Sequence, residues 1–519
     1  MDNACIVANT FVTDQVGAYY DGYVNESVID RSLRRQFEAL VIAGYFDPAA
    51  SNPYRSIGWD QVNTAQAQSL ARQAATESIT LLKNDGMLPY SFAKGQKVAM
   101  VGMWANGTTQ MQGGYLGPAP YLHSPLYAAQ QLGLDCTYAN GPLNDSTLFS
   151  NYSGPAMSAA EGADVILYFG GIDIVVESEA NDRYQIAWLQ SQVALMQQLA
   201  ALGKPMAVVQ MGTMLDATPI LNNEKISSLL WAGYPGQDGG PAAFDILTGA
   251  VAPAGRLPIT MYPADYVNQV PMTNMSLRPG PNNPGRTYRW YNDAVLPYAF
   301  GMHYTTFDAS FVSGAASPPS YPGHPHGPPG WSPPSWGPPG HGGWGGPPAS
   351  YGGWRSQYGS QPGQSFNIQQ LLSDCNAPHP DLCPFPSVSV SVKNTGKTTS
   401  DYSAVVFYNS TAGPTPYPIK TSATYGRLYA IAPGQTSIIS LNVTIGALAR
   451  RDGNGDLTIY PGDYEFLLDV PTQARMPFSL TGDAVKLEAW PQPPAEQTYS
   501  AAEPCPLYGP CPELGQPVE

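Results

Sequence analysis

Acidic side chains gather in one short segment, residues 170–183, and they are the strongest candidates for chemistry in this chain. Directly after an apolar run, the segment carries four acids, Asp173, Glu177, Glu179 and Asp182. Cleavage of a glycosidic bond needs such carboxyl groups, because one protonates the leaving oxygen and a second stabilises the anomeric centre. Acids in exposed loops are, however, mostly solvated surface groups, and Asp182 with Arg183 is equally explained as a pair that fixes the loop or as the start of a helix. The segment alone leaves both interpretations open.

Residues 104–115 mix aromatic, amide and glycine residues, a combination that suits sugar binding. Aromatic faces pack against the apolar side of a sugar ring, and amides bond its hydroxyl groups. The candidates for these contacts are Trp104, Gln112 and Tyr115. The alternative interpretation is a glycosylated surface loop, because Asn106-Gly107-Thr108 is an acceptor sequence for N-linked sugar.

The sequence lacks several other catalytic motifs. No Lys-Ser/Thr pair follows Gly107, so the glycines near it do not form a phosphate loop. No CxxC, HExxH or GxSxG motif occurs, which leaves a zinc hydrolase or a serine esterase without support. His324, His326 and His341 could form a metal-binding tract, but their irregular spacing is better explained by low sequence complexity. We predict no metal and no cofactor.

Four short apolar runs predict the sheet that positions these loops. They occupy residues 98–102, 165–170, 206–211 and 226–231, with helical patterns between them at 158–163, 185–202 and 240–247. Apolar strands that alternate with helices are typical of a parallel sheet covered on both faces. Because ligands usually bind at the carboxyl ends of such strands, the loops of interest are residues 103–116, 171–183 and 233–240.

The regions on either side of this sheet have different patterns. An amphipathic helix is expected over residues 25–45, with Asn25 as its N-cap, and a second helix over 61–82. Residues 321–360 contain twelve Gly and ten Pro, a composition typical of an extended or disordered linker. Beyond Phe366, alternating runs predict an antiparallel β-sandwich, with strands at 387–392, 402–408, 438–443 and 464–470.

Charge and cysteine content limit the possible partners and compartment. The 519 residues carry 39 acids and 24 bases, a formal charge of −15 that would repel nucleic acid and anionic lipid. No apolar stretch is long enough to cross a membrane, and the first ten residues do not resemble a secretion signal. Seven acceptor sequences for N-linked sugar, and the spacings Cys375 to Cys383 and Cys505 to Cys511, nevertheless suit an oxidising, extracellular compartment.

The order of several motifs resembles the fungal β-xylosidases of glycoside hydrolase family 3. The resemblance covers roughly residues 1–312 and 365–492. Its motifs are Tyr45-Phe46-Asp47, residues 79–86, 104–113 and 170–183, Gly233-Tyr234-Pro235-Gly236-Gln237, residues 253–258 and 381–386, and Tyr460-Pro461-Gly462-Asp463-Tyr464.

The resemblance implies a fold and a mechanism. Members of this family combine a (β/α)8 barrel, an α/β sandwich and a fibronectin type III-like domain, and they are secreted, retaining enzymes without a cofactor. By resemblance, the barrel supplies an aspartate nucleophile and the sandwich loop a glutamate that acts as acid and base. That glutamate is Glu177 or Glu179, and the spacing to Asp182-Arg183 favours Glu179. The other would then tune the pKa of the first.

The expected fold is therefore multidomain, α/β followed by all-β. The expected divisions are 1–50, a C-terminal remnant of the barrel; 51–95, a linker; 96–312, the α/β sandwich with a mostly parallel sheet; 313–364, a Gly/Pro/Trp-rich insert; 365–490, the fibronectin type III-like domain; and 491–519, a tail. The start of the chain resembles a family segment downstream of the nucleophile, so the resemblance implies an N-terminally truncated member.

We expect the function of an exo-β-xylosidase that releases xylose from the non-reducing ends of xylo-oligosaccharides. None of the 519 residues matches the nucleophile, so the chain by itself is expected to be inactive or nearly so. An α-L-arabinofuranosidase or β-glucosidase of the same family is an alternative, because the barrel residues that set specificity are missing. A carbohydrate-binding relic without catalytic activity is a further alternative.

Overall fold

The computed structural model describes residues 19–20, 25–142, 150–312 and 363–490. The chain divides into two units, residues 1–70 and 71–519, and each is described by itself. The predicted insert at 313–364 and tail at 491–519 fall almost entirely outside the described residues, as do His324, His326, His341, Cys505 and Cys511.

The N-terminal unit consists of one long helix followed by short helical turns. Helix α2 spans Glu26–Ile42, and the side chain of Asn25 accepts a hydrogen bond from Val28 N at 3.2 Å, as predicted for its N-cap. Single 3-10 turns follow at Ala49–Ser51, Pro53–Ser56 and Trp59–Gln61. No residue of α2 is buried, and Phe37 is 51% exposed, so its apolar stripe faces solvent in this structure.

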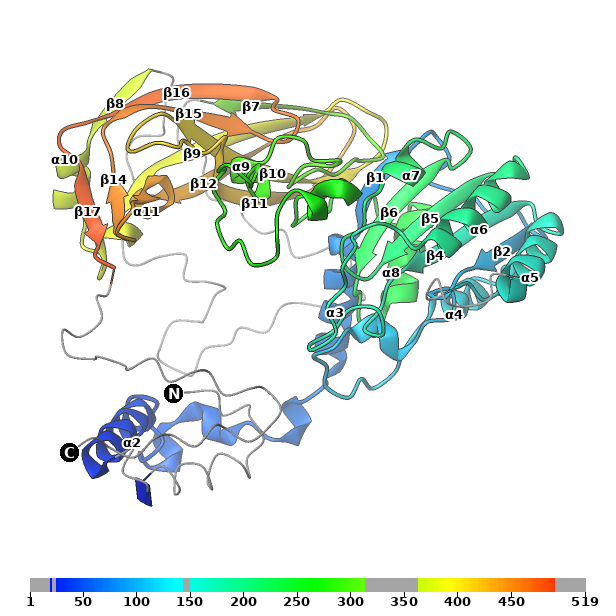
Figure 1. Ribbon diagram of the computed structural model, residues 1–519, viewed down its shortest axis with the longest axis horizontal. Helices are drawn as coiled ribbons and strands as arrows, with labels where there is room; N and C mark the ends of the chain where they lie inside the picture. Colours follow the sequence, from blue (N-terminus) through cyan, green and yellow to red (C-terminus); the bar gives the residue numbers. More distant parts are fainter. Residues whose placement is uncertain (1–18, 21–24, 143–149, 313–362, 491–519) are drawn as a thin grey trace. The chain divides into compact units, whose positions relative to one another are not determined.

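A six-stranded sheet forms the core of the α/β part. Its strands are β1 (Thr80–Asn84), β2 (Lys97–Val101), β3 (Asp135–Ala139), β4 (Val165–Gly171), β5 (Met206–Met211) and β6 (Ser228–Gly233), in the order β1-β6-β5-β4-β2-β3 (Figure 1). All neighbouring pairs are parallel except β1 with β6. The mostly parallel sheet predicted from the four apolar runs is therefore confirmed.

Helices cover both faces of this sheet, which explains why its strands are continuously apolar. Helices α5 (Ser150–Glu161), α6 (Gln190–Ala201) and α7 (Thr218–Leu221) pack on one face, against residues such as Ala99 and Ile166. Helices α3 (Ala65–Ser78), α4 (Pro125–Gln131) and α8 (Gly239–Thr248) pack on the other, against residues such as Met100 and Leu167 (Figure 1). Successive side chains thus enter two separate cores.

The strand order places a switch point between β2 and β4. From β2 the chain continues to the edge strand β3 on one side, whereas β4, β5 and β6 lie in order on the other side. Parallel sheets bind ligands where the order reverses, at the carboxyl ends of the strands. The loops that begin after β2 and after β4, which contain the candidate residues, leave the sheet at this point.

Two boundaries differ from the sequence prediction. The helix predicted over 61–82 ends at Ser78, and β1 begins two residues later, inside the predicted linker 51–95. The apolar side chains of Ile79, Leu81 and Leu82 fit a helical pattern as well as a strand, and pairing with β6 decides between them. At the other end, β7 (Phe307–Val312) pairs with β9 of the β-sandwich, although residue 312 was assigned to the α/β part.

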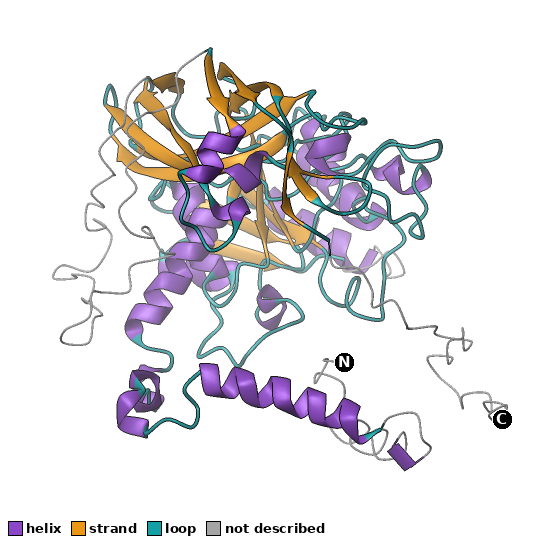
Figure 2. Cartoon of the chain, turned by 90° about the vertical axis from the view of Figure 1, so that its left-hand side faces the viewer, coloured by secondary structure: helices purple, strands orange, loops and turns teal. Residues whose placement is uncertain are grey.

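The C-terminal part is a β-sandwich. One sheet has the order β11 (Thr421–Ile431), β10 (Ser400–Ser410), β15 (Gly462–Leu468), β16 (Ala474–Thr481), β8 (Gln364–Asn367). The second is β12 (Thr436–Thr444), β9 (Pro384–Asn394), β7, and a small sheet contains β13 (Arg450–Arg451), β14 (Leu457–Ile459) and β17 (Val485–Glu488). All strands of the chain are orange in Figure 2. Within the sandwich, all described strand pairs are antiparallel except β8 with β16.

The remaining short elements lie between the strands and helices of both parts. They are the helices α9 (Thr287–Trp290), α10 (Ile368–Ser373) and α11 (Ile445–Leu448) and the 3-10 turns Thr109–Gln112, Ala264–Asn268 and Pro380–Leu382. The disulfide suggested by the spacing of Cys375 and Cys383 is present and closes the segment before β9. The all-β part predicted from the sequence is confirmed, while its finer assignment as fibronectin type III-like stays a prediction.

A buried polar cluster links the α/β part to the β-sandwich. Nη2 of Arg256 bonds Oδ2 of Asp469 at 2.8 Å, and both side chains are nearly excluded from solvent. Tyr402 donates its hydroxyl to the same carboxylate, and Gln473 bonds both Tyr402 Oη and Asp469 Oδ2, at 3.0 and 3.2 Å. The ring of His303 stacks on Tyr402, with centroids 5.7 Å apart.

The imidazole of His303 should make the protein less stable in acid. Burial, assisted by the charge of Arg256, lowers the pKa of His303 from 6.5 to about 3. Below about pH 6.5, His303 is therefore protonated in the unfolded chain but stays neutral in the folded chain. As the pH is lowered, the free energy of unfolding falls by up to about 1.4 kcal/mol per pH unit, until the pH approaches 3. We expect urea unfolding between pH 4 and 7 to show a smaller loss for His303→Phe. Parallel stability curves for the two proteins would contradict this.

Candidate active site

The loop after β4 begins at a tightly fixed glycine. Gly171 has φ +126°, and a Cβ there would lie 2.0 Å from the carbonyl oxygen of Met211 on the neighbouring strand. The buried amide of Gln192 binds both sides of its backbone, accepting from Gly171 N at 2.9 Å and donating to Gly171 O at 2.7 Å. These contacts fix the direction in which the acidic segment leaves the sheet.

Asp173 shapes the first turn of this loop. It is 2% exposed, and its Oδ1 accepts a hydrogen bond from Val175 N at 2.9 Å. Its backbone oxygen accepts from the N–H groups of Val176 and Glu177, at 3.0 and 3.1 Å. Because a buried carboxylate bound to the backbone has little access to a ligand, the structure assigns Asp173 to the support of the loop.

Glu177 is held by an arginine. Its Oε2 forms an ion pair with Nε of Arg183, and Arg183 Nη1 donates to the carbonyl oxygen of Met214 at 2.7 Å. Burial lowers the pKa of the Arg183 guanidinium, while the Glu177 carboxylate opposes that change. The sequence interpretation that paired Arg183 with Asp182 to fix the loop is corrected here, since Glu177 is the partner and Asp182 is exposed.

Glu179 lies at the exposed tip of the loop. Ser178 and Asn181 exchange backbone hydrogen bonds at 3.1 and 3.0 Å, so Glu179 and Ala180 form the two residues of a tight turn. The amide of Asn181 also donates to the carbonyl oxygen of Val175 at 3.0 Å, which ties the turn to the base of the loop. A hydrogen bond to Glu179 raises the pKa of the Tyr115 hydroxyl, so the loops after β2 and β4 meet at this pair.

The structure corrects the predicted role of Trp104. This residue is 0% exposed, and its ring lies against Tyr234, with centroids 6.1 Å apart. Tyr234 is also near the acidic loop, because burial and the charges of Glu177 and Asp173 raise its pKa. Trp104 therefore packs against Tyr234 and does not present its ring to a ligand.

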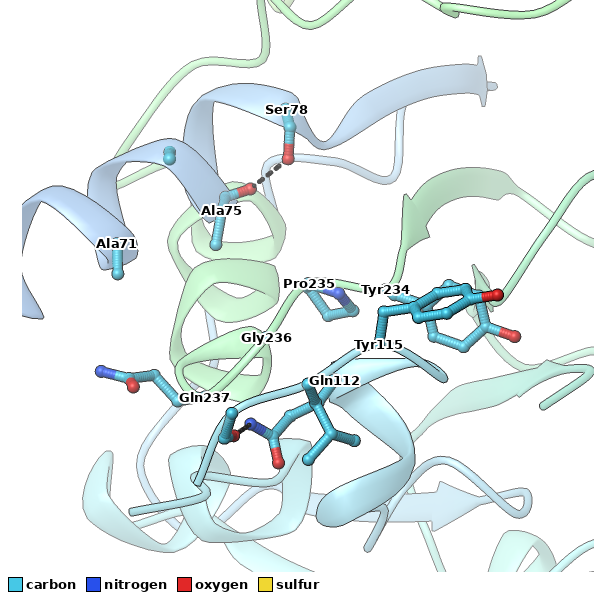
Figure 3. Close-up of a pocket in the computed structure, with 12 residues that line it drawn as sticks. Ala71, Ala75, Ser78, Gln112, Tyr115, Tyr234, Pro235, Gly236 and Gln237 are labelled. Atoms are coloured by element: carbon cyan, nitrogen blue, oxygen red, sulfur yellow. Dashed lines mark hydrogen bonds between the residues drawn. The ribbon is translucent and has the colours of Figure 1, made fainter. Parts of the chain in front are cut away.

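A pocket of about 480 Å³ opens beside these loops (Figure 3). Figure 3 shows Ala71, Ala75 and Ser78 of α3 on one side and the loop with Gln112 and Tyr115 on another. The full lining is Ala71, Ala74, Ala75, Ser78, Gln112, Tyr115, Leu116, Gly117, Tyr234, Pro235, Gly236 and Gln237. Two of the three predicted sugar contacts, Gln112 and Tyr115, thus line one pocket. Neither Glu177 nor Glu179 lines it, and Tyr115 connects Glu179 to its edge.

The residues that hold the wall of the pocket were not among the predicted site residues. Asp238, which is 5% exposed, accepts from Tyr121 Oη at 2.9 Å and contacts His123 Nδ1 at 3.0 Å. The His123 ring is stacked between Tyr121 and Tyr127, with centroids 4.3 and 4.2 Å away. The only available signal was that Asp238 falls within the loop 233–240. In the part of the chain that the structure describes, no group of three His, Cys, Asp or Glu could hold a metal ion.

Comparison with known proteins identifies the family of this chain. Residues 79–306 match the glycosyl hydrolase family 3 C-terminal domain. A probable exo-1,4-beta-xylosidase bxlB of Aspergillus terreus is 46% identical over 93% of this chain and 56% of its own length. The corresponding bxlB of Aspergillus fumigatus is 45% identical over 91% of this chain and 56% of its own length.

Solved structures also match this chain. A family 3 exo-β-xylosidase, XlnD, in complex with a xylobiose aziridine probe superposes with a TM-score of 0.75 and 38% identity, over 92% of this chain and 56% of that chain. A Listeria innocua β-glucosidase in complex with isofagomine has a TM-score of 0.65 at 18% identity over 90% of this chain and 58% of its own, which supports the fold alone. The chain thus spans little more than half the length of the relatives it matches. The chain belongs to glycoside hydrolase family 3 and contains the C-terminal domain of that family.

Proposed function

We propose that this chain supplies the acid and base, Glu179, of a retaining exo-β-xylosidase that acts on xylo-oligosaccharides. The carboxyl of Glu179 donates its proton to the leaving oxygen while a nucleophilic carboxylate bonds to the anomeric carbon. The resulting carboxylate of Glu179 then takes a proton from water, which displaces the enzyme from the sugar. The names of the curated relatives and of the 38% identical solved structure support the substrate class.

The observation that favours Glu179 over Glu177 is the arrangement of their partners. Glu177 is engaged by Arg183, which is itself anchored on Met214, so its carboxylate is not available to a leaving group. Glu179 lies at the tip of a turn that is braced by the amide of Asn181, and it forms a hydrogen bond with the hydroxyl of the exposed Tyr115. A proton donor needs this combination of a fixed backbone and an accessible carboxyl group.

The pocket beside Glu179 suits part of a sugar chain. Tyr115 is 84% exposed and offers an aromatic face, and Gln112 offers an amide that in this structure donates to the carbonyl oxygen of Gly117 at 3.2 Å. The alanines of α3 supply an apolar wall. We propose Gln112 and Tyr115 as substrate contacts, with Trp104 in support of Tyr234.

We also propose an extracellular location. The Cys375–Cys383 disulfide and the acceptor sequences for N-linked sugar support it. Among the described residues, no helix has the length and apolarity needed to span a bilayer.

Retention needs a second carboxyl, the nucleophile, about 5–5.5 Å from the first. Because none of the 519 residues matches it, we propose that the nucleophile comes from outside them. We expect no hydrolysis of 4-nitrophenyl β-xyloside by the purified chain. Joining it to the N-terminal part of the Aspergillus terreus relative should restore hydrolysis with retention. Turnover by the chain alone that disappears in Glu179→Gln would contradict the missing nucleophile. If the joined chain hydrolyses the aryl α-L-arabinofuranoside or β-glucoside faster than the β-xyloside, the proposed substrate class is wrong.

A further inference from the structure

A second pocket, of about 390 Å³, lies on the β-sandwich, outside the site described above. It is lined by Asn454, Asp456, Lys486, Ala489 and Trp490, from the turn between β13 and β14 and from the end of β17. This size falls in the range of small-molecule sites. None of these residues takes part in the proposed hydrolysis.

The turn that forms one wall is rigid. Oδ1 of Asp452 accepts hydrogen bonds from the backbone N–H groups of Asn454 and Asp456, at 2.8 and 3.1 Å. Gly455 has φ +86°, and a Cβ there would lie 2.8 Å from Cγ of Trp490. The backbone of Gly455 therefore lies directly against the indole, and the relative positions of Asn454 and Trp490 are fixed before any ligand binds.

Trp490 supplies the apolar surface of the pocket. Trp490 is 55% exposed, although its backbone N–H donates a hydrogen bond to Oδ1 of Asp456 at 2.7 Å. The guanidinium of Arg451 lies 5.8 Å from the ring centroid and donates to the carbonyl oxygen of Gly455 at 2.9 Å. An anchored indole that keeps half its surface in solvent is well placed to stack on the C–H face of a sugar ring.

The polar groups around this indole are balanced in charge. Lys486 forms an ion pair with Asp456, whose side chain is 9% exposed, and Arg451 forms one with Glu488. The pairing raises the pKa of Lys486 and lowers that of Asp456, so both are ionised at neutral pH. Because the charges cancel in pairs, the pocket favours a neutral ligand that carries several hydroxyl groups over an anion or a cation.

We propose that this pocket is a second carbohydrate-binding site, separate from the hydrolytic site, which takes a neutral sugar unit of an oligosaccharide. The sugar ring stacks on Trp490, and its hydroxyl groups bond the amide of Asn454 and the ammonium group of Lys486, which is on a side chain 55% exposed. Asp456 holds Lys486 and the Trp490 backbone in place. The site would keep the protein bound to the oligosaccharide without contributing to bond cleavage.

Isothermal titration calorimetry of the 519-residue chain with xylohexaose tests this site. The measurements use a Tyr115→Ala background, so that binding at the proposed hydrolytic pocket does not obscure the result. We expect Trp490→Ala to weaken the remaining binding about tenfold, the effect of losing one aromatic contact. Asn454→Ala, which leaves the indole in place, should weaken it about fivefold. Trp59→Ala is the matched control, because Trp59 is 88% exposed and belongs to the N-terminal unit.

Two results would overturn the proposal. One is the absence of xylohexaose binding in the Tyr115→Ala background. The other is an affinity in both Trp490→Ala and Asn454→Ala that equals that of the Trp59→Ala control. Circular dichroism of each variant identifies a loss of folding, and Asn454→Ala decides the outcome if Trp490→Ala does not fold. Since the readout is binding, failure of the proposed hydrolysis leaves this test unaffected.

Discussion

Glu179→Gln, in the chain joined to the N-terminal part of a full-length relative, should lower kcat for xylobiose by about 10²–10⁴-fold, the usual contribution of a general acid. The amide keeps the size of the side chain but has no proton to give. The loss in kcat/KM, which reports formation of the glycosyl-enzyme, should be much smaller for 2,4-dinitrophenyl β-xyloside, whose leaving group departs without protonation. Steady-state kinetics on both substrates measure the difference.

Glu177→Gln is the matched control for this experiment. It breaks the ion pair with Arg183 and loosens the loop, so it should reduce the rates of both substrates by similar factors. A leaving-group dependence that appears in Glu177→Gln and not in Glu179→Gln would exchange the roles of the two residues. Equal losses in both variants would mean that neither is the proton donor.

Asp469→Asn should destabilise the protein by about 3–5 kcal/mol, the usual cost of removing one partner of a buried ion pair. Asn fits the space and tolerates the positive φ of +68° at this position, so the backbone is unaffected. The substitution leaves the Arg256 guanidinium, 10% exposed, without its counter-charge, and it weakens the bonds from Tyr402 and Gln473. Urea unfolding, monitored by tryptophan fluorescence, measures the change in the free energy of unfolding.

An exposed ion pair of the same sandwich provides the comparison. Glu465 and Arg475 pair across β15 and β16, with side chains 29% and 58% exposed. Glu465→Gln should cost at most about 1 kcal/mol, because solvent screens such pairs. A loss in Asp469→Asn no larger than that in Glu465→Gln would show that the buried cluster does not hold the two parts of the chain together.

The sequence by itself determined the layers of the fold and the edge of the sheet where chemistry is expected. The strands β2, β4, β5 and β6 are short apolar runs separated by helices, a pattern that depends only on neighbouring residues. The same local signals predicted the N-cap at Asn25 and allowed the disulfide between Cys375 and Cys383. Such features need little knowledge of distant contacts.

Only the tertiary structure decided which candidate residues are buried and which partners they contact. Trp104 is buried because Tyr234, 130 residues further along the chain, packs against it. Glu177 is held because Arg183 reaches a carbonyl group of the loop after β5, and Glu179 meets Tyr115 because β2 and β4 are neighbours. Each of these contacts joins segments far apart in the sequence. Residue type and spacing are local properties, whereas burial and partner choice arise when distant segments pack together.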